Sequence, residues 1–209
     1  MKHVHQNKYS FAGVFVLSLV CLALAGFGCF SKDTDEPSEE NPVIDRQAIL
    51  ENAREAGLIM DEDESDAMAQ VENLIVVSGN ISLDENKLEA AKEDEYRKSG
   101  ALADVTGGGS YGIIKTKAQD GTFTLYAVVG ALPVLQSDQH YEAWLVKRDA
   151  IMKVVSLGNI SVPEGKEDHW SFLYTSHEDL SPYDFFVLTS EWNDEDITPG
   201  LHILEGTIE

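Results

Sequence analysis

Two apolar runs in the second half of the chain determine the fold class. They are Gly121-Thr-Phe-Thr-Leu-Tyr-Ala-Val-Val-Gly-Ala-Leu-Pro133 and, shortly after it, His140-Tyr-Glu-Ala-Trp-Leu-Val-Lys147. In both runs apolar and aromatic side chains recur at every second position, which is the periodicity of a β-strand. The positions between them also carry apolar residues, such as Val128 and Trp144, which is typical of strands inside a sheet. Pro133 has no backbone N–H to donate, so it belongs to the connection between the two predicted strands.

The alternating pattern continues over residues 101–209, where short runs are separated by Gly, Pro, Asn and Asp turn signals. Asp120-Gly121, which stands between two of the runs, is typical of a β-hairpin turn. Regular short strands of this kind predict a mainly β fold, an antiparallel β-sandwich of about 7–8 strands. The predicted strands cover residues 102–105, 111–117, 122–129, 140–147, 153–160, 169–175, 184–191 and 201–207.

Residues 43–100 form an acidic segment in which the apolar residues follow a helical period. Val43–Gly57 and Asp61–Val71 are predicted as two helices, and the type of the apolar run Leu74–Val77 stays open. Ser82 and Glu85 have the spacing of a capping box, which predicts a third helix from Ser82 to Gly100. The preceding residues 31–42 have no apolar side chain to bury and are expected to form a disordered acidic linker.

Residues 1–30 contain the apolar stretch Phe11–Phe30, whose length of about 20 residues is enough to cross a bilayer. Three outcomes are open for this stretch: cleavage after Ala23-Leu24-Ala25, lipidation of Cys29, or retention as an uncleaved membrane helix. Basic residues before the stretch and acidic residues after it predict a cytoplasmic N-terminus if the anchor is uncleaved. All three outcomes export residues 31–209, and retention at the membrane is the outcome that we favour.

The composition excludes several classes of partner and site. A net charge of −22 argues against binding to nucleic acid, because both molecules are strongly negative. The two cysteines, Cys21 and Cys29, lie in the apolar stretch, so residues 31–209 can contain neither a disulfide nor a cysteine zinc site.

Several segments occur in an order and spacing typical of one protein family. They are Asp104-Val-Thr-Gly-Gly108, Gly112, Asp120-Gly121, Gly130-Ala-Leu-Pro133, Tyr141-Glu-Ala-Trp-Leu-Val146, Ser156-Leu-Gly158, Val187-Leu-Thr-Ser-Glu191, Pro199 and Ile203-Leu-Glu-Gly206. Over about residues 102–208 the chain resembles the C-terminal extracytoplasmic domain of the anti-sigma-K factors, which are bacterial membrane proteins. The resemblance implies a β-sandwich on the outer side of a bacterial membrane.

The resemblance does not extend to the anti-sigma activity. In that family a cytoplasmic domain ahead of the membrane helix captures the sigma factor. Here only Met1 to about Ser10 would be cytoplasmic, which is too short for such a domain. A sigma factor is therefore not an expected partner, whereas the membrane and an envelope protein are.

An acidic run after the first predicted helix offers a weak calcium candidate. Asp61, Asp63, Ser65 and Glu72 have the spacing of EF-hand positions 1, 3, 5 and 12. Asp66 stands where the EF-hand turn needs glycine, so the favoured interpretation is that Asp61 caps a helix and Glu64 closes its capping box. His140, His169, His177 and His202 lack the spacing of metal ligands, and no cofactor is expected.

Four residues could contribute to a ligand surface: Tyr141, Trp144, Glu191 and Trp192. The competing interpretation places the aromatic residues in the core, with Trp192 as the most exposed. No Gly-x-Ser-x-Gly motif is present, so the first hypothesis is a non-catalytic, membrane-anchored, extracytoplasmic binding or regulatory module. The alternatives are an envelope-tethered enzyme using Glu142, Glu191 or a histidine, and a calcium-dependent adhesion or structural protein of the envelope.

Overall fold

The computed structural model describes residues 44–71, 74–163, 165–166, 168–194 and 196–209, which belong to one compact unit, Val43–Glu209. The apolar stretch, Cys29, the acidic linker and Glu72 lie outside the described residues. Within these ranges, no helix is both long and apolar enough to cross a membrane.

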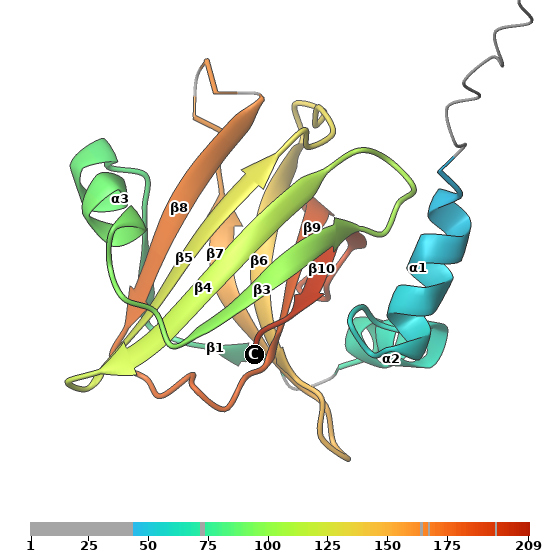
Figure 1. The fold of residues 1–209 in the computed structure, drawn as a ribbon, viewed down its shortest axis with the longest axis horizontal. Coiled ribbons are helices and arrows are strands. Elements are labelled where there is room, and N and C mark those ends of the chain that lie inside the picture. Colours follow the sequence, from blue (N-terminus) through green and yellow to red (C-terminus); the bar gives the residue numbers. More distant parts are fainter. Residues whose placement is uncertain (1–43, 72–73, 164, 167, 195) are drawn as a thin grey trace, which may run out of the picture. The chain divides into compact units, whose positions relative to one another are not determined.

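The fold is mainly β, as predicted: the described residues form three short helices and ten mostly antiparallel strands in one curled, half-barrel sheet (Figure 1). The order across the sheet is β1-β7-β6-β9-β10-β3-β4-β5-β8-β2. The helices are α1 (Arg46–Glu55), α2 (Glu62–Ala69) and α3 (Glu85–Lys92). The strands are β1 (Ile75–Val76), β2 (Gly79–Ser82), β3 (Lys98–Asp104), β4 (Tyr111–Gln119), β5 (Thr122–Gly130), β6 (Gln139–Lys147), β7 (Lys153–Ile160), β8 (His169–Ser176), β9 (Phe185–Trp192) and β10 (Leu201–Thr207).

All eight predicted strands are present, but hydrogen bonds join them into one sheet, so the prediction of two separate sheets is not confirmed. The pairing of β10 with β3 explains the difference, because it joins β7-β6-β9-β10 to β3-β4-β5-β8. Residues 75–82 add one further strand at each edge of this sheet. β1 pairs in parallel with β7, and β2 pairs antiparallel with β8, although β1 and β2 are neighbours in the sequence. This short segment therefore brings together the two edges of the curled sheet.

The main core lies between two parts of the curled sheet, with β3, β4, β5 and β8 in front of β6, β7, β9 and β10 in Figure 1. Phe172 of β8 and Phe186 of β9 are fully buried, and their ring centroids are 6.5 Å apart. A smaller second core covers the outer face of β6, β7 and β9, where Met60 and Met68 pack on Trp144 and its neighbours. The sheet thus buries apolar side chains on both faces, as the unbroken apolar runs predicted.

The turn between β4 and β5 has the backbone that a hairpin requires. Asp120 and Gly121 both adopt positive φ angles, 52° and 73°, which the two central residues of a type I′ turn need. The predicted hairpin is confirmed.

The helical predictions are confirmed in part. Asp61 caps α2 and forms the predicted capping box with Glu64. The cap of α3 is Asp84 and not Ser82, because Ser82 pairs with Leu173 in the sheet. The predicted end of this helix at Gly100 is also wrong: α3 ends at Lys92, and residues 98–100 pair with β4, because long-range strand pairing overrides a local helical period.

Three polar side chains attach the segment between α1 and α2 to the sheet. The Glu205 carboxylate accepts a hydrogen bond from the backbone N–H of Met60 over 2.7 Å. Arg148 donates to the carbonyl of Gly57 over 3.0 Å, and its guanidinium lies 4.1 Å from the centre of the Phe185 ring. Thr207 donates to the same carbonyl over 3.0 Å. By contrast, no residue within α1 itself is buried. At the N-terminal end of this helix, Arg46 donates a hydrogen bond to the carbonyl of Gly108.

Candidate functional site

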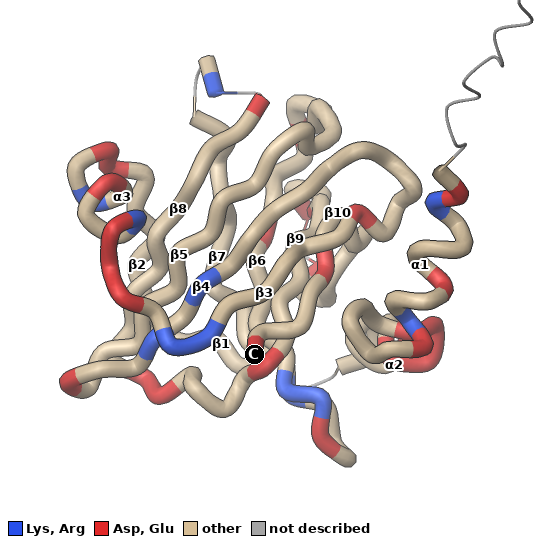
Figure 2. The backbone as a smooth tube through the Cα atoms, viewed as in Figure 1, with Lys and Arg blue, Asp and Glu red and all other residues tan. Residues whose placement is uncertain are grey.

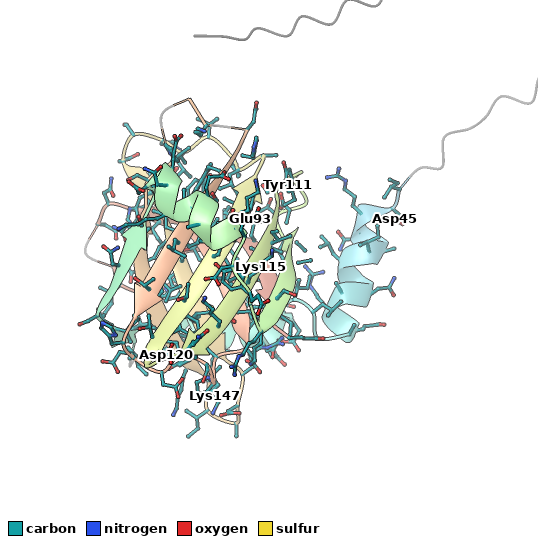
Figure 3. All side chains as sticks on the ribbon, turned by 60° about the vertical axis from the view of Figure 1, so that its left-hand side comes forward. Asp45, Glu93, Tyr111, Lys115, Asp120 and Lys147 are labelled. Carbon is teal, nitrogen blue, oxygen red and sulfur yellow. The ribbon has the colours of Figure 1, made fainter. Side chains whose placement is uncertain are left out.

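One end of the curled sheet, here called the rim end, carries the candidate site. Strands β5, β7 and β9 finish there, and β4, β6, β8 and β10 begin there. Figure 3 labels Tyr111 at this end of β4, and Asp120 and Lys147 at the opposite end of the sheet. The connections 131–138, 161–168 and 193–200 therefore all lie at the rim end.

An apolar pocket of about 380 Å³, here called the rim pocket, opens between two of these connections. Its lining residues are mostly aliphatic or aromatic and come from the β5–β6 connection, the ends of β6, β7 and β8, and the start of the β7–β8 connection. They are Leu132, Pro133, Val134, Leu135, Gln139, His140, Tyr141, Ile160, Ser161, Val162, Pro163 and Trp170. A mostly apolar wall with a few polar groups is the usual composition of a binding pocket.

Tyr141 fixes one wall of the rim pocket. Its side chain is buried in the main core, and its hydroxyl donates a hydrogen bond to the carbonyl of Pro133. Burial raises the pKa of Tyr141 to about 12, so the hydroxyl keeps its proton at neutral pH. A second bond joins the two connections, because Ala131 donates its N–H to the carbonyl of Asp168 over 2.8 Å. The wall is therefore held by the core beneath it.

Trp192 stands beside the rim pocket. It lies opposite Gln139 in the register of β9 and β6, and directly opposite residues project from the same face of a sheet. Gln139 lines the pocket, and the Trp192 side chain is 50 % exposed. Trp192 therefore adds an exposed aromatic surface next to the pocket.

The other predicted ligand-surface residues are placed differently. Trp144 is buried in the second core beneath α2, and its indole N–H donates to Thr189 over 2.9 Å. Glu191 is buried and accepts hydrogen bonds from Thr189 and from the N–H of Gly200. Neither residue offers a surface to a ligand, contrary to the prediction. The core interpretation is confirmed for Trp144 and Tyr141, although Tyr141 also lines the rim pocket.

A polar group lies on the outer face of β6, next to the second core. Glu142 accepts a hydrogen bond from Ser156, and its carboxylate lies 3.9 Å from the ring of His140. Burial and the nearby Glu191 raise the pKa of Glu142, while Ser156 and His140 oppose the shift. Ser156 bonds to the carboxylate and not to the imidazole, so this group lacks the serine–histidine hydrogen bond of a nucleophilic triad.

Substituting Glu142 by glutamine should remove a pH-dependent cost. The pKa of Glu142 is raised in the folded chain, so folding favours its protonated form. Its contribution to the free energy of unfolding is therefore complete below the usual pKa of 4.5 and is lost as the pH rises through the folded-state pKa. Glu142→Gln does not titrate and keeps an acceptor for Ser156. The variant should gain thermal stability relative to the wild type between pH 4 and pH 7, measured by circular dichroism. An unchanged difference in melting temperature at both pH values would contradict this assignment.

The metal candidates that the structure describes, Asp61, Asp63, Ser65 and the four histidines, form no metal site. Across the described ranges, no group of three His, Cys, Asp or Glu residues is arranged to hold a metal ion. Asp61 uses its carboxylate to cap α2, accepting from the N–H of Glu64 over 2.8 Å. His140 of β6 bonds to Asn193 over 2.8 Å. His202 lies in β10 and bonds to Glu205 of the same strand over 2.6 Å.

Sequence reasoning missed most of the rim pocket. Leu132, Val134 and Val162 are apolar residues in connections, and each neighbours a proline. Apolar side chains grouped in a surface loop often mark a contact surface. The segments Leu-Pro-Val-Leu and Val-Pro within connections were therefore the signal that could have identified the pocket. The two connections are far apart in the sequence, so no local pattern indicates that they line the same pocket.

Comparisons of the chain with protein-family models, with curated proteins and with solved structures give no match.

Proposed function

We propose that residues 44–209 are a non-catalytic binding module held on the outer face of a bacterial membrane, and that the rim pocket is where they bind an envelope protein. The N-terminal apolar stretch, with lipidation at Cys29 or as a retained helix, would supply the anchor. The observation that carries the proposal is the apolar pocket at the rim end.

The exposure of the pocket wall supports binding rather than packing. Val134 is 94 % exposed, although apolar side chains that serve only the fold are normally buried. The wall is also fixed in place, because Tyr141 bonds to Pro133 and Asp168 bonds to Ala131. A preformed apolar wall lowers the entropy that is lost when a partner binds.

The family resemblance supports the same position. Leu132, Pro133 and Tyr141 belong to segments that resemble the outer domain of the anti-sigma-K factors, and they line the rim pocket. A binding or sensing role for that outer domain is consistent with a contact at this end of the sheet. Nucleophilic catalysis would need a serine activated by a histidine. His140 bonds to Asn193, and among the described residues no hydrogen bond joins it to Ser161 of the pocket.

Photo-crosslinking in intact cells tests the proposal. The full-length chain would carry the photoreactive residue p-benzoylphenylalanine at position 134 or at position 151. Ile151 is a matched control, because it is 79 % exposed and lies in the β6–β7 connection, at the opposite end of β6 from Val134. Light should produce an adduct with a second protein from position 134 and none from position 151. Equal adducts from both positions, or none from position 134, would contradict the proposal.

A further inference from the structure

We infer that the partner segment bound at the rim end is cationic as well as apolar: an apolar stretch of a protein flanked by Lys or Arg. This inference rests on the proposed function and adds the chemistry of the partner. It depends on two features that surround the rim pocket, an exposed apolar surface and a set of acidic side chains.

The apolar surface at the rim end is larger than the pocket itself. Val134 is 94 % exposed, Ile197 is 71 % exposed and Trp192 is 50 % exposed. Their connections are joined, because Asn193 donates its N–H to the carbonyl of Asp138 over 2.8 Å. Exposed aliphatic and aromatic groups in neighbouring loops can contact several residues of a partner, so the occupant is expected to be a segment and not a single small group.

Four exposed aspartates stand in the same connections: Asp138, Asp168, Asp194 and Asp196. Asp138 precedes Gln139 of the pocket, and Asp168 is tied through its carbonyl to Ala131 beside Leu132. Among the described residues, none of the four forms an ion pair with Lys or Arg, and Lys166, the cation of the β7–β8 connection, pairs with Glu85. Asp194 and Asp196 accept hydrogen bonds within their own loop, but these bonds leave the negative charges in place. The four carboxylates can therefore meet positive charge on a partner.

Two cations of the described chain reach the rim end, and both are engaged: Lys166 pairs with Glu85, and Arg46 donates to the carbonyl of Gly108. The basic residues of the strands lie elsewhere. Arg97 and Lys98 stand at the start of β3, and Lys115 and Lys117 in the second half of β4, toward the end of the sheet opposite the rim end. Figure 2 shows this separation as the blue segments along β3 and β4. An acidic partner would therefore be repelled at the rim end, and an anionic lipid surface would be repelled for the same reason.

Two fluorescein-labelled 12-residue peptides test the inference. Both have the same Leu-Pro-Phe-Val centre, and one has Lys flanks where the other has Glu flanks. Binding would be followed by fluorescence anisotropy with the full-length chain in phosphatidylcholine nanodiscs. The Lys-flanked peptide should bind at least about tenfold more tightly at low salt, and the preference should shrink at high salt. The neutral variant Val134→Ser should weaken binding of the Lys-flanked peptide, because it removes apolar surface without changing the charge.

Charge-matched variants separate local from overall electrostatics. The double variant Asp138→Asn, Asp168→Asn should lose most of the preference for the Lys-flanked peptide. The control double variant Asp120→Asn, Asp149→Asn removes the same charge at the opposite end of the sheet and should keep the preference. An equal loss in both double variants would mean that net charge alone attracts the peptide, and would overturn the inference.

The remaining outcomes distinguish the inference from the proposed function. If both peptides bind equally and Val134→Ser weakens both, the rim pocket binds apolar segments and the charge inference is wrong. If neither peptide binds and position 134 gives no photo-adduct, the inference and the proposed function both fail. Quenching of chain fluorescence by brominated lipid, lost in the Trp192→Phe variant, would assign the rim end to the membrane and overturn a protein partner.

Discussion

Substitution of Gly206 by alanine is expected to destabilise the chain by more than about 3 kcal/mol, because β10 passes too close to β3 for a side chain. A Cβ atom at Gly206 would lie 2.2 Å from the carbonyl oxygen of Ala101, and one at Gly100 would lie 2.1 Å from that of Thr207. These oxygens belong to the backbone and cannot rotate away, so the strands would have to separate. Urea unfolding followed by circular dichroism measures the loss.

Gly109→Ala is the matched control for this substitution. No atom lies within 4 Å of a Cβ built at Gly109, and its φ is not in the left-handed region, so the same chemical change should alter stability by less than about 0.5 kcal/mol. Similar losses for the two variants would show that the close approach of β3 and β10 does not constrain the fold. The contact also gives a physical reason for the glycine in the Ile203-Leu-Glu-Gly206 segment.

Trp144→Ala is expected to cost about 3–5 kcal/mol, because it empties the centre of the second core. The Trp144 side chain is 2 % exposed, packs with Met60 and Met68, and donates its indole N–H to Thr189. Removal of the ring would leave a cavity between α2 and the sheet. Denaturant unfolding of the full-length chain gives the free-energy difference.

Trp192→Ala provides the comparison within the same residue type. Trp192 is 50 % exposed at the rim end, so its removal should cost less than about 1 kcal/mol. The proposed function further requires that Trp192→Ala weaken partner binding more than it weakens the fold. A stability loss for Trp192→Ala as large as that for Trp144→Ala would contradict the assignment of one tryptophan to the core and the other to the surface.

The long strands could be predicted from the sequence because their information is local. Alternation over eight or nine residues, as in β5 and β6, identifies a strand without knowledge of its partner. β1 and β2 have only two and four residues, and they exist because β7 and β8 offer free edges. The sheet is continuous because β10 pairs with β3, a long-range contact that no local pattern indicates.

The candidate site was less predictable, for reasons of geometry. Tyr141 and Trp144 are three residues apart, and strand alternation sends them to opposite faces of β6, so they could not share a surface. Trp192 was correctly expected to be exposed. The rim pocket combines Val134 with Trp170, whose proximity follows from the pairing of β5 with β8 and not from any motif.

Mass spectrometry of the protein crosslinked to position 134 is the decisive experiment, because it reports both the side of the membrane and the occupant of the rim pocket. We expect an envelope protein, attached through an apolar segment flanked by Lys or Arg. A cytosolic protein at this position, or attachment through an acidic segment, would contradict this expectation.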